Sequence, residues 1–459
     1  MTEPLFNEFQ EVSSKQWKQL IQFDLKGDDY NETLIWKTNE GINVKPFYHP
    51  DEFKSFAQIP SSNTTQWKIC QTIFVADLKK SNNKAKSVLK RGAESLKFIL
   101  PSKDISIKDL LEGIDLTSTP IFFELQFLDS EFVKQLSVIS AKTEIHLETD
   151  IIGNLARTGN WFYNLKEDHT HFEAIVKNTN GFSIDMGLYQ NAGATLVQQL
   201  AYGMAHANEY LNHFDTLLEN DAKKTFQITF NVSVGTNYFF EIAKLRALRL
   251  LWSTLASEYN VNPECHIFVT PTKRNKTLYD YNTNMLRTTT ECMSAILGGS
   301  NTICNLEYDA IYHKTNEFGE RIARNQLLIL KHESYFDKVK NPSEGTYYIE
   351  SLTEQLAEKS LQLFKEIEAN GGFLKQLKEG NIQRKIKESA LKEQEQFNTK
   401  ETVLLGTNKY ANPKDQMNNE LELYPFVKTN LRKTLIEPIL ERRLAEDLEQ
   451  QRLKTENQI

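Results

Sequence analysis

Residues 226–271 contain three segments in a row: FQITFNVSV (226–234), YFFEIAKLRALRLLWSTLASEY (238–259) and CHIFVTP (265–271). The first and third are short, apolar and rich in β-branched and aromatic residues, which is typical of strands. The long middle segment predicts an amphipathic or buried helix. Two parallel strands need such a crossover, so this unit favours a parallel α/β sheet.

The same alternation extends from about residue 65 to about residue 310. Six further strands are predicted: WKICQTIF (67–74), LKFIL (96–100), IFFELQF (121–127), TEIHLET (143–149), FSIDMGL (182–188) and NTICNLE (301–307). Eight β–α repeats predict a closed (β/α)8 barrel of the TIM type, because closure removes exposed sheet edges. No Gly-x-Gly-x-x-Gly follows the first strand, so a dinucleotide-binding fold has no local support.

Three regions are predicted. Residues 1–64 form an N-terminal helix, expected over 1–25 with apolar residues from Phe6 to Phe23 roughly on one side, and then an extended arm limited by Pro46 and Pro50. Residues 65–398 form the barrel and its C-terminal helices, expected near 316–335, 350–369 and 371–396. Residues 399–459 form a loop and a charged tail helix from about residue 429. The arm and the tail are the candidates for contact with a partner.

Composition narrows the function classes. The net charge of −7 argues against nucleic acid as the main partner. No apolar run approaches the roughly 20 residues that a membrane span needs. The cysteines, at positions 70, 265, 292 and 304, have no metal-site spacing and indicate free thiols in a reducing compartment. The N-terminus lacks the features of a secretion signal or transit peptide, so we expect a cytoplasmic protein.

Several segments resemble the acyl-CoA-binding barrel of the methylmalonyl-CoA mutases. They are NAGATLVQQLAYGMAHANEYL (191–211), FFEIAKLRALRLLW (239–252), NMLRTTTECMSAILGGSNTICNLEYDA (284–310), RIARNQLLILKHES (321–334), NPSEGTYYIESLT (341–353) and GTNKY (406–410). The resemblance extends from roughly Trp67 to Tyr410. It implies the radical interconversion of methylmalonyl-CoA and succinyl-CoA, with adenosylcobalamin as cofactor.

The resemblance also implies that the chemistry has been lost from this chain. Leu188 stands where the family has a His that donates to the thioester carbonyl, and leucine cannot donate a hydrogen bond. Cys70 replaces an Arg and Thr72 replaces a Tyr that face the substrate and cobalamin. The loop after the second strand, PSKDISIKDL (101–110), keeps no trace of the family's loop. In VTPTKRNKT (269–277), Val269 stands where another Arg is expected.

The family's cobalamin module is not recognisable either. It carries Asp-x-His-x-x-Gly, and the nearest string here is EDHTHF (167–172). The chain therefore resembles the small, non-catalytic subunit of heterodimeric mutases, with no catalytic, cofactor-binding or metal-binding residue of its own. The resemblance implies that a large subunit holds both adenosylcobalamin and the acyl-CoA substrate. Two alternatives stay open: a substrate-binding subunit that uses a separate cobalamin-binding chain, and a scaffold or assembly barrel.

Other polar features have ordinary structural interpretations. His169 and His171 are interpreted as part of a polar loop rather than as metal ligands. Asp185 is expected at a solvated strand end, and His206 as a core or surface histidine. A helix-to-strand turn is expected at residues 298–300 rather than a phosphate cradle. Phe239, Phe240 and Trp252 are expected to pack one helix into the core.

Overall fold

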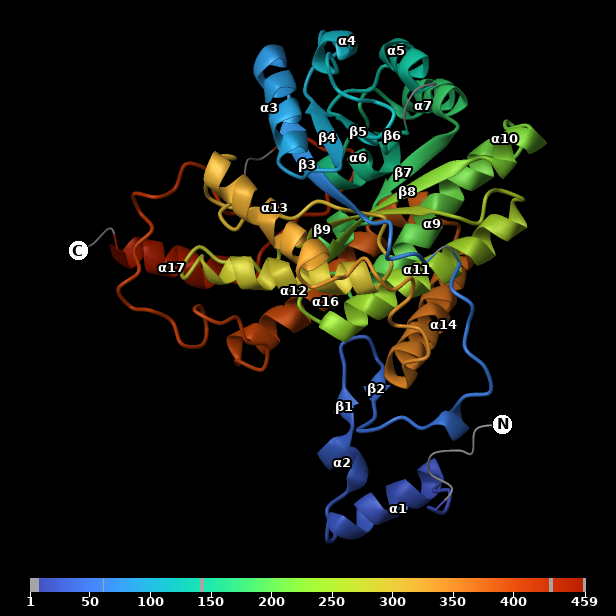
Figure 1. The fold of residues 1–459 in the computed structure, drawn as a ribbon, viewed down its shortest axis with the longest axis vertical. Coiled ribbons are helices and arrows are strands. Elements are labelled where there is room, and N and C mark those ends of the chain that lie inside the picture. Colours follow the sequence, from blue (N-terminus) through green and yellow to red (C-terminus); the bar gives the residue numbers. More distant parts are fainter. Residues whose placement is uncertain (1–7, 61, 141–143, 429–431, 457–459) are drawn as a thin grey trace.

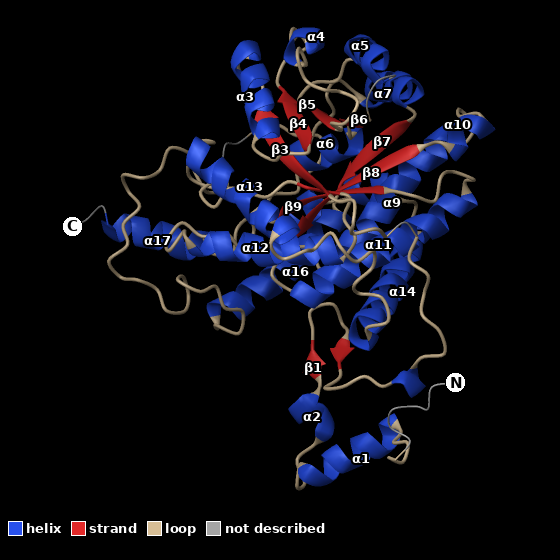
Figure 2. Ribbon diagram, in the orientation of Figure 1, coloured by secondary structure: helices blue, strands red, loops and turns tan. Residues whose placement is uncertain are grey.

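The computed structural model describes residues 8–60, 62–140, 144–428 and 432–456. The short apolar runs form the strands of one parallel sheet, coloured red in Figure 2. Its order is β6-β5-β4-β3-β10-β9-β8-β7. Because β6 and β7, the two outer strands of that order, also lie side by side, the sheet is nearly closed into a barrel. The predicted (β/α)8 barrel is confirmed.

The predicted strands are present, but several are shorter than predicted: the run expected over 121–127 ends at Leu125, and that over 143–149 keeps Ile145–Glu148. The run expected to continue to residue 188 ends at Asp185, and the last strand keeps only Thr302–Ile303. The barrel strands are β3 Lys68–Phe74, β4 Ser95–Leu100, β5 Ile121–Leu125, β6 Ile145–Glu148, β7 Gly181–Asp185, β8 Gln227–Val234, β9 His266–Pro271 and β10 Thr302–Ile303.

Side chains alternate between the two faces of each barrel strand, as the two-residue period of a strand requires. On β3, Ile69 and Ile73 join the large core beneath the helices. Cys70 belongs instead to a small cluster with Phe122, Phe268 and Cys304. This second set lies inside the barrel. The interior is therefore a packed core and not a pore.

Helices cover the outside of the sheet (Figure 1). The crossover expected over 238–259 is α11, Tyr238–Glu258, on which Phe240 and Trp252 are fully buried, as predicted. The expectation was wrong for Phe239, which is 49% exposed. The other helices between β3 and the end of α13 are α3 Leu78–Lys90, α4 Ile107–Leu110, α5 Ser130–Ser140, α6 Ile151–Thr158, α7 Leu165–Thr179, α8 Gly187–Ala192, α9 Leu196–Phe214, α10 Asn220–Lys224, α12 Thr283–Leu297 and α13 Glu317–His332.

Between α13 and the tail the described chain has three helices, where two were predicted. Helix α14 spans Tyr347–Ala369 and packs against α9 and α11. The helix expected over 371–396 is divided into α15, Phe373–Lys378, and α16, Asn381–Asn398. Gly380 lies between them with a φ of +77°, a left-handed conformation that glycine adopts without the penalty of a Cβ. This glycine therefore ends one helix and reorients the next.

The tail differs most from its prediction. Helix α17 covers only Glu446–Glu456, and the expected start near 429–431 lies outside the described residues. From 432 to 445 the chain is not helical and lies against its own barrel. The Leu435 amide donates to Gly159, that of Ile439 to Ala156 and that of Leu444 to Arg274. Pro438 lies within this run, and a proline cannot supply the amide that a helix interior needs.

The N-terminal arm extends away from the barrel and is drawn in dark blue in Figure 1. It comprises α1 Ser14–Asp24, α2 Tyr30–Leu34, the antiparallel pair β1 Trp36–Lys37 and β2 Asn43–Val44, and the short 3-10 helix Pro50–Glu52. The predicted helix is confirmed only from residue 14, where Ser13 and Gln16 form a capping box. Phe6 lies outside the described residues. None of the described helices is both long enough and apolar enough to cross a membrane.

Candidate site at the mouth of the barrel

The carboxyl ends of the strands surround a cavity of about 550 Å³. In a (β/α)8 barrel this end of the strands carries the functional site, because the βα loops converge there. Residues of six strands, β4 to β9, line the cavity, among them Glu124, Glu148, Asp185, Ser233 and Thr270. The helix α6 and the tail contribute Arg157 and Glu441. The lining is therefore mostly polar and strongly charged.

Lys97 of β4 is bound within this wall by two carboxylates. Its Nζ lies 2.5 Å from Glu148 and 2.9 Å from Glu124. Burial acts to lower the pKa of Lys97, but the charges of Glu148 and Glu124 outweigh it and raise the pKa. Lys97 in turn holds the pKa of Glu124 below its usual value. The lysine is thus a charged group whose partners are already in place.

Arg157, at the end of α6, is the second cation of the wall. It pairs with Asp185 at the end of β7 and with Glu441 of the tail, the latter at 3.0 Å. Burial raises the pKa of Asp185, although Arg157 acts against it. Asp185 was expected at a solvated strand end, but it is a paired wall residue. The third cation of the lining, Lys273, is exposed at the rim.

Aromatic and imidazole groups lie directly behind the cavity. His206 of α9 is completely buried, and its Nε2 lies 2.9 Å from Asp150 Oδ1, an ion-pair contact rather than an aligned hydrogen bond. Tyr210 donates to Asp150 at 2.7 Å, and the Tyr189 hydroxyl lies 3.0 Å from His206 Nδ1. Burial acts to raise the pKa of Asp150, but His206 and the hydrogen bonds lower it. Among these residues only Asp150 lines the cavity.

The floor of the cavity is closed by rings. Phe268 of β9 lines the cavity, and its ring centre lies 4.9 Å from that of Phe122. Phe122 stacks on His146 at 4.5 Å. Below them Cys304 Sγ lies 3.1 Å from the Thr72 hydroxyl. A hydrogen bond with Cys70 and a second with Thr72 lower the pKa of Cys304 to about 7, although burial opposes them.

The three positions singled out in the sequence do not converge on the cavity. Cys70 and Thr72 lie together in the interior, beside Cys304, and Cys70 is buried. Leu188 is in α8 and not on a strand, and it is 1% exposed within the main core. Val269 is likewise buried in that core. The substituted positions are therefore packing residues in this chain.

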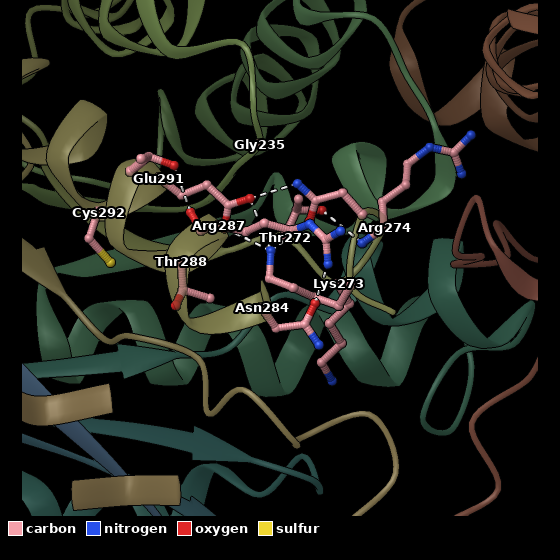
Figure 3. Close-up of polar contacts among 12 residues, drawn as sticks. Gly235, Thr272, Lys273, Arg274, Asn284, Arg287, Thr288, Glu291 and Cys292 are labelled. Atoms are coloured by element: carbon pink, nitrogen blue, oxygen red, sulfur yellow. Dashed lines mark hydrogen bonds and ion pairs between the residues drawn. The ribbon is translucent and has the colours of Figure 1, made fainter. Parts of the chain in front are cut away.

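The loop after β9 is tied into the protein by buried polar contacts, which Figure 3 shows. Lys276 forms an ion pair of 2.8 Å with Glu291 of α12, and both side chains are buried. Asn275 donates to the same carboxylate at 2.6 Å. Thr272 donates to Asn191 at 2.7 Å, and Arg443 of the tail donates to the Lys276 carbonyl at 3.0 Å. The loop is thus fixed between the helix and the tail.

The remaining predicted features are resolved by their secondary structure. His169 and His171 are in helix α7, so the polar-loop interpretation was wrong. The His169 ring contacts the Leu165 carbonyl and the His171 ring contacts Ser130, so they share no ligand position. Gly298 ends α12 and Gly299 has a φ of +84°, which confirms the predicted turn into β10.

Sequence reasoning missed two groups of residues. The ion pairs of the mouth join residues far apart in the chain, so spacing gave no signal for them. Glu144, His146 and His266 bring three possible metal-ligand atoms to within 4.8 Å of one another at the opposite end of the barrel. Glu144 and His146 alternate on one face of a predicted strand, which was the one available signal.

A (β/α)8 barrel with a charged cavity at the carboxyl ends of its strands defines an α/β protein of the TIM-barrel class. The family model described as methylmalonyl-CoA mutase matches residues 104–456. The chain belongs to the methylmalonyl-CoA mutase family, as its sequence motifs predicted.

Individual relatives agree with this assignment. The chain is 33% identical to the methylmalonyl-CoA mutase small subunit of Porphyromonas gingivalis, over 99% of this chain and 78% of that protein. It is 28% identical to the small subunit of Streptomyces virginiae, over 82% of this chain and 66% of that protein. The large subunit of Porphyromonas gingivalis is 33% identical to this chain over a match that covers 56% of this chain and 36% of that protein.

Proposed function

We propose that this chain is the small, non-catalytic subunit of a heterodimeric methylmalonyl-CoA mutase. In this proposal a large subunit binds the substrate and interconverts methylmalonyl-CoA and succinyl-CoA. The similarity to small subunits from two organisms supports it, as does the presence of a related large subunit in one of them.

The charge of the mouth is the observation that carries the proposal. Five carboxyl groups and three cations line the cavity, and the two cations of the inner wall already have carboxylate partners. An acyl-CoA whose acyl group ends in a carboxylate would meet a surplus of negative charge there. To bind, it would have to displace internal ion pairs that are shielded from water. The carboxyl groups are Glu124, Glu148, Asp150, Asp185 and Glu441.

The donor that the family's chemistry needs has no counterpart at the cavity. All nine histidines of the chain lie in its described part, and none is among the residues that line the mouth. His206 comes nearest but is sealed behind the wall and contacts Asp150 and Tyr189. Phe122 and Phe268 fill the axis below the cavity, so a pantetheine-like chain could not extend along it.

The family depends on cobalamin, and we place that cofactor on the partner. The chain has no Asp-x-His-x-x-Gly segment to supply a cobalt ligand. At the mouth, the Lys97 and Arg157 pairs lie where a flat apolar ring system would require uncharged wall residues. The residues present do not suit the cofactor, and no step of the reaction is assigned to this chain.

The N-terminal arm is the proposed contact with the large subunit. Helix α1 has no buried residue, and its Trp17, Leu20 and Phe23 are 43%, 59% and 80% exposed. Clustered exposed apolar side chains mark interaction surfaces. We also place the complex in the cytoplasm, because the four cysteines are all unpaired and buried, as expected in a reducing compartment.

The test is reconstitution. This chain and a cobalamin-bearing mutase large subunit are purified separately and assayed alone and mixed at one-to-one stoichiometry. We expect no turnover by this chain with free adenosylcobalamin, and complex formation with the large subunit. Turnover by the isolated chain would refute the proposal.

Binding measurements on the isolated chain separate the other functions. Tight binding of methylmalonyl-CoA would instead support a substrate-binding subunit that uses a separate cobalamin-binding chain. Stable capture of a non-mutase protein, without any large subunit, would support a scaffold or assembly barrel.

A further inference from the structure

The amino end of the barrel holds a group of side chains that the mouth does not use. Glu144 directly precedes β6, His146 is on β6 and His266 is the first residue of β9. One ligand atom from each lies within 4.8 Å of the other two. The His146 and His266 rings are 4.3 Å apart between centres. Two imidazoles and a carboxylate thus converge toward the amino end of the barrel, and the ring of Phe122 separates the imidazoles from the Phe268 ring that lines the cavity.

Each imidazole is oriented by a threonine on another strand, His146 on β6 by Thr229 on β8 and His266 on β9 by Thr302 on β10. His146 Nδ1 lies 3.1 Å from the Thr229 hydroxyl, and His266 Nε2 lies 3.0 Å from the Thr302 hydroxyl. The threonine occupies one nitrogen of each ring, and the second nitrogen of His146, Nε2, faces Glu144 Oε1 at 2.8 Å. Histidines that bind metals are held in the same way, because a hydrogen bond to one nitrogen fixes the tautomer and the orientation of the ring.

We propose that Glu144, His146 and His266 bind one divalent transition-metal ion, for which zinc is the best match. Two histidines and one glutamate are a ligand set of three-coordinate protein sites for zinc, with water as the fourth ligand. Imidazole also suits other first-row divalent ions, whereas magnesium and calcium prefer oxygen ligands. The site has no part in the proposed mutase reaction.

The geometry needs only a small adjustment to receive the ion. Ligands of a tetrahedral zinc site lie roughly 3.3 Å apart, given bond lengths of about 2.0–2.1 Å. Glu144 Oε1 and His146 Nε2 are 2.8 Å apart, and the three ligand atoms all lie within 4.8 Å of one another. His146 is buried and stacked on Phe122, so it is held in place. The Glu144 side chain is 52% exposed, which gives an ion access from solvent.

The same contacts have a metal-free interpretation. Glu144 and His146 can form a simple ion pair: the hydrogen bond with His146, and to a smaller degree the charge of Lys68, lower the pKa of Glu144 without any metal, although burial opposes them. The two interpretations differ in one respect. An ion pair between Glu144 and His146 does not involve His266, whereas the metal site requires all three side chains and is strengthened by both threonines.

The experiment is a titration of the untagged, chelator-treated full chain with Zn²⁺ by calorimetry, and with Co²⁺ by visible absorption. We expect one equivalent to bind, with a d–d spectrum of low coordination number for cobalt. The variants Glu144→Gln, His146→Gln and His266→Gln should abolish stoichiometric binding. Thr229→Val and Thr302→Val should weaken it about 10-fold to 100-fold. His332→Gln, at an exposed helix position, is the matched control and should bind as the wild type does.

Circular dichroism and thermal unfolding of each metal-free variant show whether it is folded. If a glutamine variant fails to fold, the two valine variants carry the test, because they remove no ligand. The proposal is overturned if the wild-type chain binds no stoichiometric metal, or if the His266→Gln variant binds as tightly as the wild type. Only the Glu144–His146 ion pair would then remain.

Discussion

Replacing Lys276 with methionine separates the two roles that the loop after β9 could have. In the family this loop belongs to the substrate site, but here Lys276 faces Glu291 at 2.8 Å with both side chains buried. At an effective dielectric constant of 20, two charges at this distance attract by about 6 kcal/mol. Much of this attraction offsets the cost of removing both groups from water.

Lys276→Met removes the partner and leaves the carboxylate in place. Glu291 then keeps only the hydrogen bond from Asn275, so we expect a loss of about 3–5 kcal/mol in the free energy of unfolding. With an unfolding entropy of about 2.1 cal/mol/K per residue, 459 residues give a fall in Tm of about 3–5 °C. The double variant Lys276→Met/Glu291→Gln removes the unpaired charge, keeps an acceptor for Asn275 and should recover most of the loss.

The pH dependence supplies a second signature. Burial raises the pKa of Glu291 even in the intact protein, and loss of Lys276 raises it further. An acid whose pKa is higher in the folded chain makes folding less favourable as pH rises above its unfolded pKa of about 4.3. The deficit of Lys276→Met should therefore be larger at pH 8 than at pH 5.

The assay is calorimetric or fluorescence-monitored thermal unfolding of the single and double variants at both pH values. Lys224→Met is the matched control, because Lys224 forms an exposed ion pair with Asp221 and should leave Tm unchanged. If Lys276→Met unfolds at the wild-type temperature and instead abolishes acyl-CoA binding, then Lys276 is a substrate ligand and our reasoning fails.

Three further predictions concern other parts of the chain. Leu188→His should lower Tm, because a buried polar group without a partner costs about 1–3 kcal/mol, and it should give the isolated chain no activity. Leu188→Met is the control, and turnover by the histidine variant would contradict the prediction. Burial acts to raise the pKa of Asp150, but His206 holds it low, so ionised Asp150 stabilises the fold above its unfolded pKa of about 3.9, and this stability is lost as pH falls. Asp150→Asn should therefore make Tm less dependent on pH below about pH 4, and an unchanged Tm profile would exclude this role. The double variant Trp17→Ser/Phe23→Ser should leave Tm unchanged but weaken binding of the large subunit at least about 10-fold, as measured by calorimetry. Unchanged binding would show that the interface does not include helix α1.

The fold could be predicted from sequence because its signals are local. Each strand is a short apolar run, and α11 is a long amphiphilic segment between two of them. The errors occurred where local propensity lost to a distant contact. The run after Asp185 is apolar enough to continue as a strand, but Gly187 starts helix α8 instead. The tail has a helical composition, yet its amides from 435 to 444 bind the barrel.

The site was harder to predict because its pairs form only on barrel closure. Arg157 and Glu441 are separated by 284 positions, and no spacing rule links them. The Glu144 and His146 pair was visible in one strand, but His266 reaches it only from β9. The family motifs singled out Cys70, Thr72 and Leu188, and the loss of chemistry at these positions stays a prediction. They did not reveal that Leu188 would be buried in the core rather than exposed at the cavity.

The buried rings of the barrel interior and the paired charges of the mouth explain why no single substitution should restore a catalytic barrel. The inward-facing positions of a barrel need packing partners, and its buried charges need counter-charges. Here Phe122 and Phe268 supply the packing, and carboxylates such as Glu148 neutralise Lys97. Under the proposed function, the same contacts that stabilise the barrel would oppose binding of an anionic substrate. A working site would therefore require the rings, the carboxylates and the tail's Glu441 to change together, because each now depends on the others for its partner.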